Sequence, residues 1–289
     1  MTQTLRSSQP KANGIAHTEP TRVSSGFPEL DQLTEGFQPG QLIFVASRYS
    51  MGKTALALSI VEHVAIREDL PVAVFCLASC TSELKMRLAS SISGICLHDI
   101  KTNQISTEDW HCLNSANKTL EGSKLHISGH TRLSLNELSE RVRRLASEHG
   151  KLGLIVVDDL EHTHFISAKR GKALASELDA LSHALKSLAH KHCCPVIVTT
   201  QLGRRMEIRR DKRPRLKDLR AGGRLEQAAD LIISVYRDDY YTREASYSPG
   251  VAEISVMKHL NGNTGFAMLA FNKLLAKFEN LTNTHQESI

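Results

Sequence analysis

The chain has 289 residues, 41% of them hydrophobic and 23% charged, which is the composition of a globular protein with one large domain or two small ones. No apolar run approaches the roughly 18 to 20 residues that span a bilayer, and the polar N-terminus lacks the apolar segment of a secretory signal, so we expect a cytoplasmic protein with no membrane contact. The net charge of +5 is compatible with a polyanionic partner.

Residues 1–21 are rich in Ser, Thr, Gln and Pro, and we expect them to form a flexible arm or linker. A folded domain is expected over residues 22–280, followed by a disordered tail at 281–289. Apolar runs and helical periodicity then alternate along the chain. In chain order, strands are expected at residues 42–46, 72–77, 125–128, 154–157, 195–200, 231–236, 252–257 and 267–272. Helices are expected at residues 53–66, 82–93, 135–149 and 173–192.

This alternation predicts an α/β fold with a mostly parallel, twisted sheet covered by helices on both faces. The last three expected strands are separated by loops rather than helices. An antiparallel or mixed edge is therefore expected at the C-terminal end of the sheet.

The cysteine and histidine residues give no pattern typical of a metal site. The six cysteines show no repeated C-x-x-C pairing, and the fourteen histidines are scattered along the sequence. We therefore expect reduced thiols in a cytosolic setting and assign no histidine to a metal.

The segment 47–54, Ser-Arg-Tyr-Ser-Met-Gly-Lys-Thr, follows one expected strand and precedes one expected helix. In such a loop, Gly52 lets the backbone approach phosphates, and the helix N-terminus favours negative charge. Lys53 would reach the β- and γ-phosphates, and the Thr54 hydroxyl would bind Mg²⁺. The usual pattern begins with Gly, where Ala46 or Ser47 stands here. A chance Gly-Lys-Thr is the alternative, but the flanking elements favour a phosphate loop, with Ser50 also among the nucleotide-binding candidates.

Asp158 ends the apolar run 154–157 and is the candidate metal-orienting carboxylate. A buried parallel strand that delivers one Asp at its carboxyl end places that side chain beside the phosphate loop. The alternative is an Asp that caps a turn. The upstream loop favours the first interpretation, so ATP with Mg²⁺ is the expected ligand pair.

Several motifs occur in a characteristic order along the chain. Through them, residues 24–280 resemble the C-terminal motor domain of DnaB-type replicative helicases. The segments that carry the resemblance are 25–31, 36–40, 48–54, 154–158, 200–202, 211–214, 218–220, 226–230, 236–238 and 261–262. The resemblance implies a RecA-like fold and a ring, usually hexameric, with nucleotide between subunits and single-stranded DNA in the channel. It also implies movement from 5′ to 3′.

The resemblance assigns roles to further residues. Gln201 would sense the γ-phosphate, and Arg237 would belong to the nucleotide site. The loop 220–224 would face DNA phosphates, which suits its two arginines and its glycines. A dense basic run at 204–217 would track a phosphate backbone, or it could be a solvated charged loop. The DNA-binding candidates are Arg204, Arg220, Gly223 and Arg224.

Two positions depart from the family pattern. Ala78 stands where the family has a Glu that polarises the attacking water, and Leu260 stands where it has an arginine finger. Lys258, two residues before Leu260, is retained and is the nearest candidate cation. Asp159 follows Asp158 and is a candidate replacement for the missing Glu. Losing a finger costs about 10³ to 10⁵ in rate, and losing a base costs roughly 10² to 10⁴.

Two functions therefore remain open at the level of sequence. The first is an ATP-hydrolysing helicase motor that works as a homo-hexamer on single-stranded DNA. The second is a catalytically weakened, nucleotide-gated subunit that binds DNA and regulates a true helicase, or joins it in a mixed ring. Nucleotide binding is expected in both cases because Lys53, Thr54 and Asp158 are present.

Overall fold

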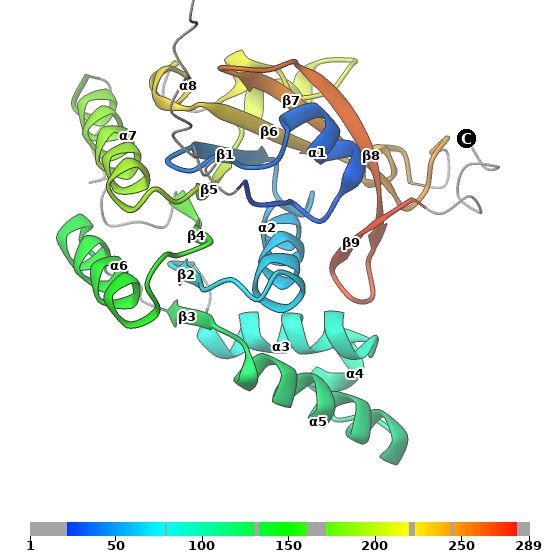
Figure 1. Ribbon diagram of the computed structural model, residues 1–289. Helices are drawn as coiled ribbons and strands as arrows, with labels where there is room; N and C mark the ends of the chain where they lie inside the picture. Colours follow the sequence, from blue (N-terminus) through cyan, green and yellow to red (C-terminus); the bar gives the residue numbers. More distant parts are fainter. Residues whose placement is uncertain are drawn as a thin grey trace, which may run out of the picture.

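The computed structural model describes residues 22–78, 80–129, 133–160, 172–219, 223–243 and 246–281, and Figure 1 shows its ribbon. The expected arm at 1–21, and all of the expected tail except Leu281, lie outside these residues. The strands are β1 (Leu42–Ser47), β2 (Val72–Cys76), β3 (Leu125–Gly129), β4 (Leu154–Asp158), β5 (Val196–Gln201), β6 (Leu231–Tyr236), β7 (Val251–His259), β8 (Gly265–Asn272) and β9 (Lys277–Asn280).

The α-helices are α1 (Pro28–Thr34), α2 (Lys53–Glu62), α3 (Thr81–Ser93), α4 (Leu97–Thr102), α5 (Thr107–Gly122), α6 (Leu135–His149), α7 (Lys172–His192), α8 (Arg224–Ala228) and α9 (Asp238–Thr242). A π-helix, η1 (His63–Arg67), extends α2, and two short 3₁₀-helices, η3 (Arg204–Ile208) and η4 (Leu216–Asp218), follow β5.

The strands form one sheet in the order β3-β2-β4-β5-β1-β6-β7-β8-β9. From β3 to β6 all neighbours are parallel, and from β6 to β9 they are antiparallel. The predicted α/β fold with a mixed C-terminal edge is therefore confirmed. Every residue of β1, β2, β4, β5 and β6 is buried, which explains why these strands are continuous apolar runs.

Helices cover both faces of the sheet, as the sequence predicts. One buried cluster joins the sheet to α1, α2 and α3, through residues such as Leu30, Leu56 and Leu84. A second cluster joins the opposite face to α6, α7 and α8, through Leu138, Leu185 and others. Figure 1 shows α6 and α7 together on one side of the sheet and α2 on the other.

The sequence analysis did not predict the helical pair α4 and α5. Helix α4 has no fully buried residue, and α5 buries Leu113 and Ala116 among its sixteen residues. Apolar periodicity is therefore weak here, because this pair covers the small cluster of Ala89, Ile95 and Leu113 rather than the main core. The signal that could have found α5 is its capping box, in which Ser106 and Asp109 exchange hydrogen bonds.

The sequence analysis also did not predict the short helices α1, α8 and α9, and two further elements differ from expectation for local reasons. The helix expected over residues 53–66 is α-helical to Glu62 and continues as a π-helix to Arg67. Strand β9 was not predicted, because it has four residues and fully buries one of them, Phe278. Among the described residues, no helix is both long and apolar enough to cross a membrane.

Candidate functional site

The phosphate loop connects the carboxyl end of β1 to the start of α2. Gly52 is the residue before α2 and has a backbone φ of 108°, a conformation that L side chains rarely adopt. A Cβ atom at this position would also lie 2.9 Å from the Phe278 ring. Two constraints therefore favour glycine at position 52: the positive φ angle and the close approach of the Phe278 ring. The N-terminus of α2 then opens at the place where phosphates would bind.

Asp158 lies at the carboxyl end of β4, beside the phosphate loop. Its Oδ1 atom accepts hydrogen bonds from the hydroxyls of Thr54, at 2.9 Å, and Thr199, at 2.5 Å. Burial raises the pKa of the Asp158 carboxyl, although both hydrogen bonds act in the opposite direction. Hydroxyl and carboxylate oxygens are the ligands that Mg²⁺ prefers, so Thr54 and Asp158 fit a magnesium site.

Lys53 forms an ion pair with Asp159, with 2.8 Å between Nζ and Oδ2. Both side chains are nearly buried, with exposed fractions of 11% and 7%. The candidate replacement base is thus within reach of the residue that would hold the γ-phosphate. The Lys53 ammonium group has three N–H donors, so phosphate oxygens of a bound nucleotide would compete with the Asp159 carboxylate for them.

Ala78 follows the end of β2, next to the strand that carries Asp158. The two strands are in register at Cys76 and Asp158, and the Leu77 N–H donates to the Asp158 carbonyl at 2.6 Å. Ala78 is exposed. The position that resembles the family's water-polarising Glu therefore lies close to the site, but its methyl group cannot accept a proton.

Gln201 and Arg48 connect the phosphate loop to the segment after β5. Gln201 is buried at the end of β5 and is in register with Ser47 of β1. Arg48, also buried, donates to the Leu202 carbonyl at 2.8 Å and pairs with Glu207 at 2.8 Å. Glu207 belongs to η3, so two contacts join the nucleotide site to the segment that contains the basic run.

Arg237 lies under the phosphate loop and is 5% exposed. Its guanidinium pairs with Asp239 at 3.1 Å, donates to the Ser50 carbonyl at 3.4 Å and covers the Phe271 ring at 4.1 Å. Burial lowers the pKa of Arg237, against the attraction of Asp239. This residue therefore supports the loop backbone at Ser50.

Lys258 lies far from the phosphate loop of its own chain. It is in register with Ile232 at the start of β6, whereas the end of β1 that leads into the loop is in register with Val235. The Lys258 ammonium donates to the carbonyls of Glu226 and Ala229, both at 2.6 Å, at the end of α8. Any catalytic contact of Lys258 would have to be with a neighbouring subunit.

Much of the basic run at 204–217 is neutralised within the chain. Arg209 pairs with Asp218 at 2.8 Å, Arg213 with Glu253 at 2.8 Å, and Arg215 with Asp211 at 3.2 Å. These three arginines are paired within the chain, so we expect the other cations of the run to be the ones available to DNA phosphates.

The DNA-binding candidates are placed differently from one another. Arg204 begins η3 and is exposed. Gly223 has a φ of 88° and precedes α8, and Arg224 pairs with Asp179 at 3.2 Å. Arg220 lies outside the described residues. The described candidates are therefore Arg204, Gly223 and Arg224, of which Arg224 is paired with Asp179.

The sequence analysis missed two residues with clear roles. Thr199 holds Asp158, and Glu207 holds Arg48. For Thr199 a signal was available, because β5 is apolar from Val196 to Val198 and then turns polar. For Glu207 no signal was available, because this residue lies within a run of basic residues that was interpreted as a whole.

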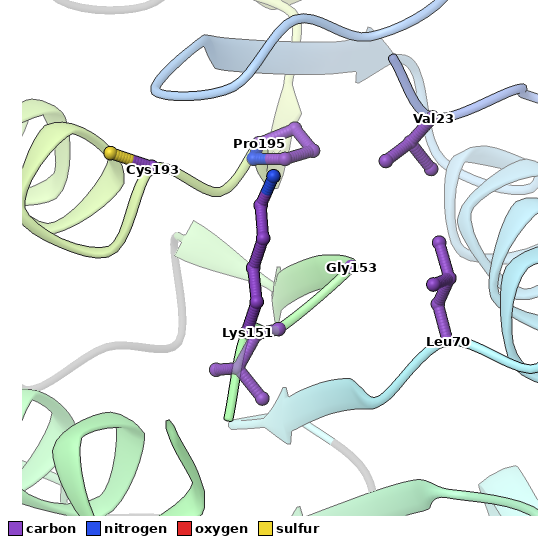
Figure 2. Close-up of a pocket in the computed structure, with 7 residues that line it drawn as sticks. Val23, Leu70, Lys151, Gly153, Cys193 and Pro195 are labelled. Atoms are coloured by element: carbon purple, nitrogen blue, oxygen red, sulfur yellow. The ribbon is translucent and has the colours of Figure 1, made fainter. Parts of the chain in front are cut away.

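A separate small cavity of about 100 Å³ lies at the opposite end of the sheet, where β2, β4 and β5 begin (Figure 2). Its wall is mostly apolar, and Lys151 extends across it toward Pro195. The lining residues are Val23, Leu70, Lys151, Leu152, Gly153, Cys193 and Pro195. It therefore takes no part in the phosphate site, which lies at the carboxyl ends of the strands.

The parallel sheet, the glycine turn before α2, and the group of Lys53, Thr54 and Asp158 define a RecA-like phosphate-loop NTPase domain. The family model of the DnaB-like helicase C-terminal domain matches residues 22–280 of this chain, so the chain belongs to this family.

Relatives of known function agree with this assignment. The chain is 39% identical to the replicative DNA helicase DnaC of Bacillus subtilis, over 90% of this chain and 57% of that protein. It is 41% identical to the replicative DNA helicase DnaB of Pasteurella multocida, over 92% of this chain and 56% of that protein. The chain thus spans somewhat more than half the length of these curated relatives.

Solved structures give the same fold. The ATPase domain of G40P superposes with a TM-score of 0.85 at 33% identity, covering 92% of this chain and 94% of that chain. A KaiC-like protein from Pyrococcus horikoshii superposes with a TM-score of 0.59 at 16% identity, covering 90% of this chain and 98% of that chain. The second match shows the fold alone.

Proposed function

We propose that this chain is the ATP- and Mg²⁺-dependent motor of a replicative helicase, which moves 5′ to 3′ on single-stranded DNA as a homo-hexameric ring in the cytoplasm. The observation that carries the proposal is the convergence of Lys53, Thr54 and Asp158 at one loop. The relatives named as replicative helicases support it.

In this proposal the chain's own residues bind and orient the nucleotide. Lys53 leaves Asp159 and contacts the β- and γ-phosphates, while the N–H groups at the start of α2 face the phosphate oxygens. Thr54 and Asp158 would hold Mg²⁺, which would neutralise charge that develops on the phosphates. Arg237 keeps the loop in place through Ser50.

Asp159 is the proposed acceptor of the water proton. Once Lys53 has moved to the phosphates, the Asp159 carboxylate is no longer paired with it and stays close to the γ-phosphate. The water oxygen forms a bond to the γ-phosphorus, the bond to the bridging oxygen breaks, and the water proton goes to Asp159. ADP and phosphate then leave. Asp is one methylene shorter than Glu, which favours slow rather than fast turnover.

The second candidate, a non-hydrolysing subunit that regulates a helicase in a mixed ring, rests on Ala78 and Leu260. The comparisons do not favour it, because the relatives that match are replicative helicases. It predicts tight nucleotide binding without turnover, and altered unwinding when the chain is added to an active helicase.

The test is strand separation on a forked duplex with a 5′ single-stranded tail, with the Lys53→Ala variant as the inactive control. The motor separates the strands when ATP and Mg²⁺ are present. Absence of unwinding by a ring that binds ATP and DNA would overturn the motor.

The role of Asp159 is tested separately by Asp159→Asn. We expect turnover to fall by roughly 10² or more, with ATP affinity unchanged or higher, because Lys53 loses a competing carboxylate. Turnover at the unmodified rate would eliminate Asp159 as the base while leaving the motor in place.

A further inference from the structure

Strand β3 is the edge of the nine-stranded sheet, and a cavity of about 320 Å³ lies beside it. The lining residues are Phe75, Lys85, Leu125, His126, Ile127, Ser128, Arg141, Arg144 and Leu145. They include four successive residues of β3, whose side chains alternate between the two faces of the sheet. A cavity that contacts all four therefore borders the open edge rather than one face.

The helices on both faces contribute cations to this cavity. Lys85 comes from α3, which packs on the same face as α2, and Arg141 and Arg144 come from α6 on the opposite face. Arg141 donates to the Ser128 hydroxyl at 2.9 Å. Arg144 lies 3.9 Å from Glu148, at the outer limit of an ion pair. The described lining of the cavity therefore has three cationic side chains and no acidic one.

The backbone of β3 also has capacity for pairing. The Lys124 carbonyl accepts from the Val72 N–H at 3.0 Å, so this carbonyl points toward β2. In a parallel ladder alternate residues point to the same neighbour. The N–H and C=O groups of Leu125 and Ile127 therefore point away from β2, and no strand in the described part of the chain pairs with β3 on that side.

His126 adds a further polar group at this edge. Its Nε2 atom is buried and has no hydrogen-bond partner among the described residues. Its ring lies 4.5 Å from that of His149 at the end of α6. A buried nitrogen without a partner is costly unless a ligand or water satisfies it.

We propose that the β3 edge binds an extended acidic peptide segment of a partner protein, which adds a strand to the sheet and places carboxylates against Lys85, Arg141 and Arg144. Peptide N–H and C=O groups match those of Leu125 and Ile127, as in strand addition to other sheet edges. A nucleic-acid backbone matches the charge but offers no such N–H groups. A second copy of this edge is repelled, because like charges would meet.

The test uses fluorescence polarisation of the whole chain with a labelled peptide, acetyl-Thr-Val-Glu-Asp-Glu-Val-Thr-amide. We expect saturable binding that weakens by about tenfold or more in the Lys85→Glu, Arg144→Glu double variant. The matched control is Arg143→Glu, because Arg143 lies on the same helix, outside the cavity, and pairs with Glu140 at 2.7 Å. This control should bind the peptide nearly as well as the unmodified chain.

Two further arms separate strand addition from simple charge attraction. The same peptide with alternate amides N-methylated keeps its charge but loses the donors of one edge, and should bind at least tenfold more weakly. An oligothymidylate should not displace the peptide at equal charge. No binding of the peptide, equal binding of the N-methylated peptide, or displacement by oligothymidylate would each overturn the proposal. ATP turnover of the double variant should stay unchanged, since these residues lie outside the phosphate site.

Discussion

At the scale of single residues, the candidate nucleotide site depends on the hydroxyl groups that orient the Asp158 carboxylate. This carboxylate is buried and accepts hydrogen bonds from the hydroxyls of Thr54 and Thr199. In the proposed site Thr54 would also bind Mg²⁺ when nucleotide is present, whereas Thr199 in β5 would keep its hydrogen bond to the carboxylate. We therefore expect Thr199 to keep Asp158 oriented both with and without nucleotide.

Replacing Thr199 with Val should weaken Mg²⁺-dependent ATP binding about tenfold, because a hydrogen bond to a charged group contributes about 1.5–3 kcal/mol. The measurement is an ATP titration with and without Mg²⁺. Ser234→Ala is the matched control, since this buried hydroxyl of β6 has no hydrogen-bond partner among the described residues. Equal weakening in both variants would mean that general packing, rather than the contact with Asp158, is responsible.

Sequence patterns predict residues of the candidate site where the chemistry restricts the residue type, as it does at Gly52, Lys53 and Thr54. They also place Asp158, because an apolar strand that ends in one Asp is a distinct pattern. They do not show the ion pair of Lys53 with Asp159, because it joins the segments after β1 and β4, two strands that β5 separates in the sheet. The partners of Lys258 at the end of α8 are equally invisible in the sequence.

At the scale of elements, the contact between the phosphate loop and η3 would connect the proposed nucleotide site to the proposed DNA-binding segment. Arg48 is buried and joins the loop to both Leu202 and Glu207. Apolar periodicity predicts the strands on either side of this contact, since they are buried. It misses α4 and α5 because those helices cover a small satellite cluster with mostly polar surfaces.

Replacing Glu207 with Gln removes the charge of this pair and leaves the bond from Arg48 to Leu202 in place. We expect ATP affinity to persist, while the stimulation of ATP turnover by single-stranded DNA falls about fivefold or more, the usual size of coupling between sites. The measurement is turnover against DNA concentration. Arg205→Gln, a neighbouring exposed change in η3, is the control, and equal loss in both would contradict a specific connection.

At the scale of the whole molecule, the β7–β8 hairpin carries Leu260 with 62% of its surface exposed. The exposed leucine suits a contact with another subunit, and its lack of charge removes the cation that an arginine finger would supply. Family membership accounts for the fold of residues 22–280. We expect position 260 to affect the rate of ATP turnover in an assembled ring.

Replacing Leu260 with Arg should raise ATP turnover of the assembled ring by at least about tenfold, because an arginine finger contributes about 10³ to 10⁵ in rate where its geometry is optimal. ATP affinity should change little. The control is Leu274→Arg, since Leu274 is similarly exposed at 66% but lies in the turn before β9. No increase in turnover would show that Leu260 does not occupy the finger position.

The most direct test of the motor is steady-state ATP turnover by the unmodified chain, with and without single-stranded DNA, beside the Lys53→Ala variant. The proposed motor hydrolyses ATP slowly by itself and faster when DNA is present, and Lys53→Ala abolishes both rates. Tight ATP binding with no turnover above that of Lys53→Ala, at any DNA concentration, would contradict the motor.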